Sequence, residues 1–121
     1  LKGCGDTGLY IPYATSETTL VATRCEFTNG NCAAFVEGSL SSATFKNCVV
    51  NDNSNDGIFV GGATIHLHGE ATAIHSNEDH GIYAYDSAKV VIHLPSHHNT
   101  TYNNRSDRQT YSGATITNVE D

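Results

Sequence analysis

Short stretches of alternating apolar and polar residues run along the chain and recur at a nearly fixed interval. Four of them are alike, and their first residues are 25, 24 and 24 positions apart: Gly8–Ile11, Ala33–Val36, Gly57–Val60 and Gly81–Ala84. In the third, Ile58 and Val60 would face one side of a strand and Phe59 the other, because side chains alternate along a β-strand. A period of this length is typical of stacked repeats, each of which buries its apolar face against its neighbours.

A second strand-like segment follows each of these stretches in a matching register. The matching segments are Leu20–Asn29, Ala43–Asn53, Thr64–His68, Val90–Leu94 and Gly113–Val119. The alignment puts Cys25 beside Cys48, and Phe27 in one column with Val50 and Ile74. No segment has a sustained 3.6-residue apolar period, so helices should contribute little.

Asparagine recurs in the turns between these segments, at two fixed distances from the start of each repeat. Asn29, Asn53 and Asn77 stand four residues before it, and Asn31, Asn55, Asp79 and Asn103 stand two before it. Asparagine tolerates a left-handed backbone and can hydrogen-bond to its copy one repeat away. The spacing therefore predicts two polar ladders along the turns.

Constant spacing of short strands and polar turns favours parallel stacking over a meander of hairpins. Parallel crossover connections are almost always right-handed. We therefore predict an all-β fold, a right-handed parallel β-helix (a single-stranded solenoid) of about four to five coils of about 24 residues each. One domain would span 1–121, with coils at 8–32, 33–56, 57–80 and 81–104 and an incomplete one at 105–121.

The acidic composition narrows the range of partners. A net charge of −7 with only six Lys and Arg excludes a nucleic-acid-binding surface, and it would repel polyanionic glycans unless a bound cation intervened. No stretch approaches 18 consecutive apolar residues, so no membrane partner is expected. A glycan or a protein remains as the expected ligand.

The four cysteines (Cys4, Cys25, Cys32 and Cys48) all lie in the first half of the chain. Their even number permits disulfides and favours an extracellular or secretory location, whereas reduced cysteines would serve as small buried residues. Both alternatives remain open, as does the pairing. Because the chain begins at Leu1, we expect a mature form or a domain cut from a longer protein.

The order Gly-Ile-Phe/Tyr-Val, followed by Ala43–Asn53 and again by Gly-Ile, resembles the parallel β-helix repeats of the pectate-lyase-like superfamily. It is most similar to the carbohydrate-binding and sugar-hydrolase repeats of alginate epimerases and certain F-box proteins. The resemblance covers residues 5 to about 119. It implies the fold, and it implies that an active cleft would follow one parallel sheet, lined by outward side chains of successive coils.

One outward column along the predicted sheet is aromatic: Tyr10, Phe35, Phe59 and Tyr83, with Tyr85 beside it. At about 4.8 Å per coil these rings would form an apolar ribbon on which sugar rings could stack. The alternative is a stack of rings that only stabilises the sheet. We predict a non-catalytic module that binds carbohydrate or protein through this face.

The resemblance also implies a second function, the cleavage or epimerisation of polyuronates, which requires acid–base groups. The nearest cluster consists of the Asp79 carboxylate, the His80 imidazole and the Tyr83 phenol. Asp52 and Asp56, one coil away, would complete a small cation site, so Ca²⁺ is expected only if the protein acts on polyuronates, and otherwise no cofactor. The Asp-Pro-His-Glu signature of the epimerases and the polygalacturonase motifs are absent, which favours the binding module.

His66 and His68 should project from the same side of one strand, and His93 would stack on them from the next coil if the spacing is one residue longer. Three imidazoles of this kind could bind a transition metal, although histidines on a strand surface are more often single. No amphipathic helix caps either end of the predicted solenoid. The chain is therefore expected to continue into a longer β-helix or to associate end to end with other copies.

Overall fold

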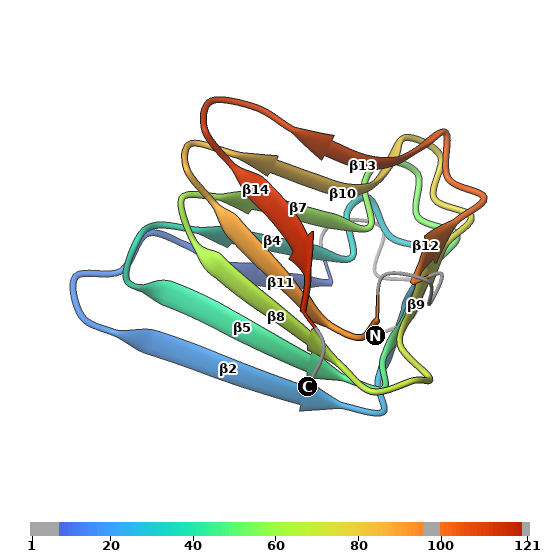
Figure 1. The fold of residues 1–121 in the computed structure, drawn as a ribbon, viewed down its shortest axis with the longest axis horizontal. Helices are drawn as coiled ribbons and strands as arrows, with labels where there is room; N and C mark the ends of the chain where they lie inside the picture. Colours follow the sequence, from blue (N-terminus) through green and yellow to red (C-terminus); the bar gives the residue numbers. More distant parts are fainter. Residues whose placement is uncertain (1–7, 96–99, 120–121) are drawn as a thin grey trace.

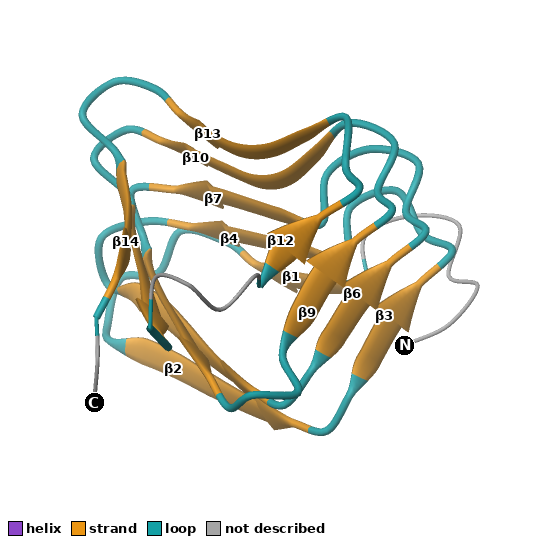
Figure 2. Ribbon diagram, turned by 45° about the vertical axis from the view of Figure 1, so that its right-hand side comes forward, coloured by secondary structure: helices purple, strands orange, loops and turns teal. Residues whose placement is uncertain are grey.

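The computed structural model describes residues 8–95 and 100–119. In this part of the chain, three parallel β-sheets enclose one narrow interior (Figure 1). Each of the first four coils contributes one strand to every sheet, and the last coil contributes two strands (Figure 2). The described residues form no helix. The prediction of an all-β parallel β-helix is confirmed.

Two of the three sheets are named by their outward side chains, and the third by the shortness of its strands. The aromatic sheet consists of β1 (Leu9–Ile11), β4 (Ala34–Glu37), β7 (Ile58–Gly61), β10 (His80–Tyr85) and β13 (Ser106–Thr110). The histidine sheet consists of β2 (Thr18–Thr23), β5 (Ser41–Lys46), β8 (Thr64–His68), β11 (Lys89–His93) and β14 (Thr115–Asn118). The short sheet consists of β3 (Glu26–Thr28), β6 (Val49–Asn51), β9 (Ala73–His75) and β12 (Thr101–Tyr102).

Alternation along each strand separates a buried column from an outward one. In β7, Ile58 and Val60 are fully buried and Phe59 is half-buried, as the two-residue period predicts. Val50 pairs with Ile74 one coil away, so the core consists of columns of equivalent residues. Each coil thus buries its apolar side chains only against the coils on either side.

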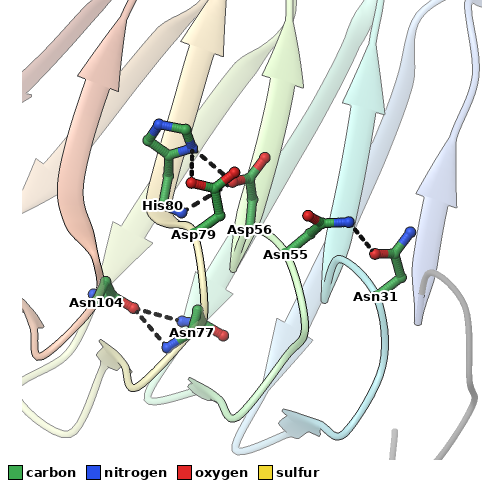
Figure 3. A network of polar contacts seen from close by, with 7 residues as sticks. All are labelled: Asn31, Asn55, Asp56, Asn77, Asp79, His80 and Asn104. Atoms are coloured by element: carbon green, nitrogen blue, oxygen red, sulfur yellow. Dashed lines mark hydrogen bonds and ion pairs between the residues drawn. The ribbon is translucent and has the colours of Figure 1, made fainter.

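A ladder of buried amides runs through the corner that precedes the aromatic sheet. The Oδ1 atom of Asn77 accepts hydrogen bonds from the backbone N–H and from Nδ2 of Asn53, at 3.3 and 2.8 Å. Asn104 accepts in the same way from Asn77, at 3.0 and 2.9 Å (Figure 3). A second ladder outside it joins Asn55 to Asn31. Polar groups that the corner would otherwise leave unpaired are thereby satisfied.

Two residues that the sequence assigns to these ladders lie elsewhere. The placement of Asn29 beside Asn53 is wrong, because Gly30 donates its N–H to Asn53 Oδ1 and holds that position. The placement of Asn103 in the outer ladder is also wrong. Asn29 and Asn103 both have positive φ, 60° and 54°, and occupy the left-handed turn itself. There the tolerance of asparagine for this backbone conformation outweighs its use as a ladder residue.

The fourth coil, which runs from β10 to β13, is longer than the others. Ile58 pairs with Ile82, 24 residues later, whereas Ile82 pairs with Arg108, 26 residues later. The start of the last coil, predicted at 105, corresponds in this register to Asp107, and Asn104 takes the ladder position. The distance between paired residues rises from 24 at β10 to 25 at β11 and 27 at β12 and then falls to 26 at β13, so most of the added length lies between β11 and β12.

Polar side chains close the C-terminal end of the interior. Arg108 occupies the inward column of Ile58 and Ile82, and its guanidinium donates to Thr101 Oγ1 at 3.1 Å and to Asn118 Oδ1 at 2.9 Å. Burial lowers the pKa of this guanidinium. The sequence predicts an end without a cap because no amphipathic helix is visible, but these side chains cover the last coil. End-to-end association stays a prediction.

Cys25 and Cys48 stand side by side in the core, as the alignment predicts, and no disulfide joins them. The Cys48 thiol is buried and donates to the Ala22 carbonyl oxygen at 3.4 Å. Burial raises the pKa of this thiol, which keeps it protonated. The interpretation as a small buried residue holds for Cys48, and Cys25 is partly buried against the same core, whereas Cys4 lies outside the described residues.

Candidate functional site

The outward residues of the aromatic sheet form one continuous surface, the aromatic ridge (Tyr10, Phe35, Phe59, Tyr83 and Tyr85). Ring centroids along it are 5.1 Å apart between Tyr10 and Phe35, 4.8 Å between Phe35 and Phe59, and 5.2 Å between Phe59 and Tyr83. Parallel, in-register strands produce this spacing because they place equivalent residues directly above one another. The structure thus brings together all five ligand-binding residues predicted from the sequence.

The rings of the ridge contact one another but keep part of their surface open. Tyr10 is 53% exposed, and the other four are half-buried. Phe59 and Tyr83 are nearly parallel, at 5°, whereas Phe35 meets Phe59 edge to face at 74°. Such contacts stabilise the sheet, and they also hold the outer edges of the rings in fixed positions.

A shallow hollow lies at the end of the ridge, lined by Phe59, Tyr83, Tyr85, Tyr111 and Ser112. Tyr111, which is 61% exposed, is missed by the sequence interpretation because it stands outside the repeated signature. Gly61 makes room for the Tyr85 ring: a Cβ atom at this position would lie 2.4 Å from Tyr85 Cζ. A small residue in one coil therefore positions an aromatic ring of the next.

An acidic side chain lies beside the ridge near its N-terminal end. Tyr10 donates its hydroxyl to Glu37 Oε2 at 2.8 Å. This hydrogen bond raises the pKa of the Tyr10 phenol, while burial, followed by the negative charge of Glu37, raises the pKa of Tyr85. Both phenols therefore remain neutral hydrogen-bonding groups at physiological pH, and the ridge itself carries no positive charge.

A carboxylate–imidazole pair adjoins the ridge where β10 begins. His80 Nδ1 lies 2.8 Å from Asp56 Oδ1 and 3.5 Å from Asp79 Oδ1 (Figure 3). Asp56 is buried and also accepts the His80 backbone N–H at 3.0 Å, so its carboxylate fixes the orientation of the ring. The other ring nitrogen points away from both carboxylates (Figure 3). The His80 ring meets Tyr83 edge to face, with centroids 4.9 Å apart.

Two of the three predicted catalytic residues, His80 and Tyr83, are thus in contact. The third, Asp79, lies near His80 but farther from its ring than Asp56 does. The principal partner of His80 is Asp56, which the sequence suggests only as part of a cation site. Arg108, which could neutralise a substrate carboxylate, instead turns into the interior. Arg105 is exposed and immediately precedes β13, at the edge of the sheet where His80 lies.

The three predicted metal ligands also lie together, on the histidine sheet. His93 pairs with His68 in the parallel register, which confirms the one-residue lengthening. His66 Nδ1 is 2.9 Å from His93 Nε2, and the rings of His68 and His93 stack with centroids 3.9 Å apart. Burial, followed by the positive charges of His93 and Lys89, lowers the pKa of His66.

Comparison with known proteins agrees with this architecture. The family model for right-handed β-helix regions matches residues 1–120. The chain belongs to the right-handed β-helix family. Searches of curated proteins and of solved structures gave no match. Among the described residues of this β-helix protein, no helix is long and apolar enough to cross a membrane.

Proposed function

We propose that this right-handed β-helix protein is a non-catalytic binding module that holds an uncharged linear glycan along its aromatic ridge. The observation that carries the proposal is the unbroken line of five outward rings, which ends in the hollow lined by Tyr83, Tyr85 and Tyr111. Aromatic rings offer large apolar contacts to sugar rings and lose little conformational freedom on binding.

The geometry and the charge both support a neutral, extended ligand. Successive rings repeat at about 4.8 Å, close to the length of one hexose unit, so an extended chain would place one sugar on each coil. Glu37, Asp56 and Asp79 lie along the same sheet, and the chain carries a net charge of −7. These charges oppose the binding of polyuronates and other anionic glycans.

Replacing Tyr83 or Tyr85 with alanine is expected to weaken glycan binding by roughly tenfold or more, since each ring contributes contact area at the hollow. Isothermal titration calorimetry with neutral hexasaccharides of glucose, xylose and mannose would measure the effect, with hexagalacturonate as the charged comparison. Tyr102→Ala is the matched control, because Tyr102 stacks on His75 at 4.9 Å on the short sheet.

Gly61→Ala tests the same site without removing a ring. The added methyl group would displace the Tyr85 ring from its place above the glycine, so glycan binding should fall as in Tyr85→Ala. If none of the neutral glycans binds, or if Tyr102→Ala weakens binding as much as Tyr83→Ala, the ridge is not the binding surface.

The pair formed by Asp56 and His80 favours a second function, a polyuronate lyase or epimerase reaction. A buried carboxylate that orients an imidazole is an arrangement suited to a general base. The second nitrogen of this ring points away from both carboxylates (Figure 3), and the ring contacts Tyr83. The proton next to a uronate carboxylate would be the one abstracted, by that nitrogen of His80.

An assay for unsaturated uronate products, run with polygalacturonate and alginate, tests this second function; ¹H NMR of the alginate would report epimerisation. If the reaction occurs, His80→Ala should abolish it, and Asp56→Asn should lower kcat by about 10²-fold or more by releasing the ring. Asn55→Ala, in the same turn but outside the pair, should leave it unchanged. Binding of neutral glycans with no product from either polymer would support the binding module instead.

A further inference from the structure

We propose that His66, His68 and His93 form a binding site for a divalent transition metal ion, Zn²⁺ or Cu²⁺, on the outer face of the histidine sheet. The site lies on β8 and β11, on a different sheet from the aromatic ridge and from the pair of Asp56 and His80. It therefore does not depend on the proposed glycan binding.

The backbone fixes the three imidazoles in one cluster. His66 and His68 are two residues apart on β8, so both project outward, and His93 is the in-register partner of His68 on β11. The residues that alternate with them, Leu67 and Ile92, are fully buried and hold both strands against the core. A metal would meet ligands that the fold already holds together, rather than ligands gathered from mobile loops.

The nitrogen positions are close to those that a metal requires. One nitrogen of each ring lies within 4.8 Å of the others, and His66 Nδ1 is 2.9 Å from His93 Nε2. Tetrahedral zinc with bonds of about 2.0–2.1 Å places its nitrogen ligands about 3.3–3.4 Å apart. The stacked rings of His68 and His93 would have to rotate out of their parallel arrangement so that their nitrogen lone pairs converge on one ion. The ion would replace the hydrogen bond between His66 and His93. The donor ring would change tautomer, so that the proton leaves the nitrogen that binds the ion and the other ring nitrogen takes up a proton from water.

The chemistry of the cluster selects the class of ion. All three ligands are imidazole nitrogens, which suit zinc, copper and nickel, whereas calcium and magnesium prefer oxygen ligands. Lys46 pairs with His68 across the neighbouring coil, and no carboxylate stands among the three ligands. The three imidazoles leave the remaining coordination positions to water or to a small anion.

Titration of the full chain with ZnCl₂ or CuCl₂ alone, followed by calorimetry, tests the proposal. One ion should bind per chain, CaCl₂ should not compete, and zinc should raise the Tm of the protein. His66→Asn and His93→Asn should each weaken binding by roughly tenfold or more. His75→Asn, a histidine on the short sheet that stacks on Tyr102, is the matched control and should bind normally.

Long-range ¹H–¹⁵N NMR of the imidazoles gives a readout that does not depend on variants. On addition of Zn²⁺, ring nitrogens of His66, His68 and His93 should shift, while those of His75 and His80 remain in place. The proposal is overturned if no ion binds, if the double variant His66→Asn/His93→Asn binds as tightly as the wild type, or if the shifts fall on other histidines.

Discussion

Replacing Asn77 with alanine is expected to destabilise the protein by about 2–4 kcal/mol, because the change opens the buried ladder at its middle. Asn77 is 2% exposed. Its Oδ1 atom accepts two hydrogen bonds from Asn53, and its Nδ2 atom donates to the Val50 carbonyl oxygen and to Asn104 Oδ1. Alanine would leave the Asn53 backbone N–H buried without an acceptor, and it would leave a cavity beside it.

Urea denaturation followed by far-UV circular dichroism would measure the loss. Asn55→Ala is the matched control: it removes the same kind of coil-to-coil bond, from Asn55 to Asn31, but at an exposed position. Its effect should stay within about 0.5 kcal/mol. Equal losses of unfolding free energy in the two variants would show that the contribution of Asn77 to stability does not depend on its burial.

The sequence predicts the strands of this protein well because each of them obeys a strict local rule. A core residue alternates with an outward residue, and a slip of one position would turn Ile58 and Val60 toward solvent. The same rule places the aromatic ridge and the cluster of His66, His68 and His93. These sites follow from the repeat alone.

The turns obey weaker rules, and here the predictions from the sequence fail. Asn29 and Asn103 satisfy the spacing of a ladder, but the left-handed corner accepts asparagine equally well, so spacing cannot tell the two positions apart. The fourth coil departs from the 24-residue period mainly between β11 and β12, where the distance between paired residues rises from 25 to 27. Insertions there change the loop without disturbing the strands.

The sequence places Asp56 one coil away from His80, but only as part of a cation site, and it does not predict that the two side chains pair. They are 24 residues apart, Asp56 just before β7 and His80 at the start of β10, and the exact alignment of these two coils determines whether they meet. Arg108 presents the converse case: its charge indicates a surface position, but its place in the inward column makes it a cap. Both are contacts between coils, which a pattern within one coil does not contain.

Phe45→Ala is expected to cost about 3–5 kcal/mol of stability, the largest loss of any single substitution considered for this protein. Phe45 is 1% exposed and meets Phe27 edge to face, with ring centroids 5.8 Å apart, where the histidine sheet faces the short sheet. Removing its ring leaves a cavity that the rigid stack of coils above and below cannot fill. Thermal and urea unfolding of the variant would measure this cost.

Phe35→Ala is the informative comparison, since it removes the same ring from the outward side of the neighbouring sheet. Phe35 is half-buried between Tyr10 and Phe59, and its loss removes two aromatic contacts worth about 0.5–1.5 kcal/mol each. A cost of about 1–2 kcal/mol in stability, together with weaker glycan binding, would mean that the rings of the ridge bind a ligand in addition to stabilising the sheet. If Phe35→Ala costs as much as Phe45→Ala and no glycan binds, the ridge is a structural stack, and the rings serve the fold alone.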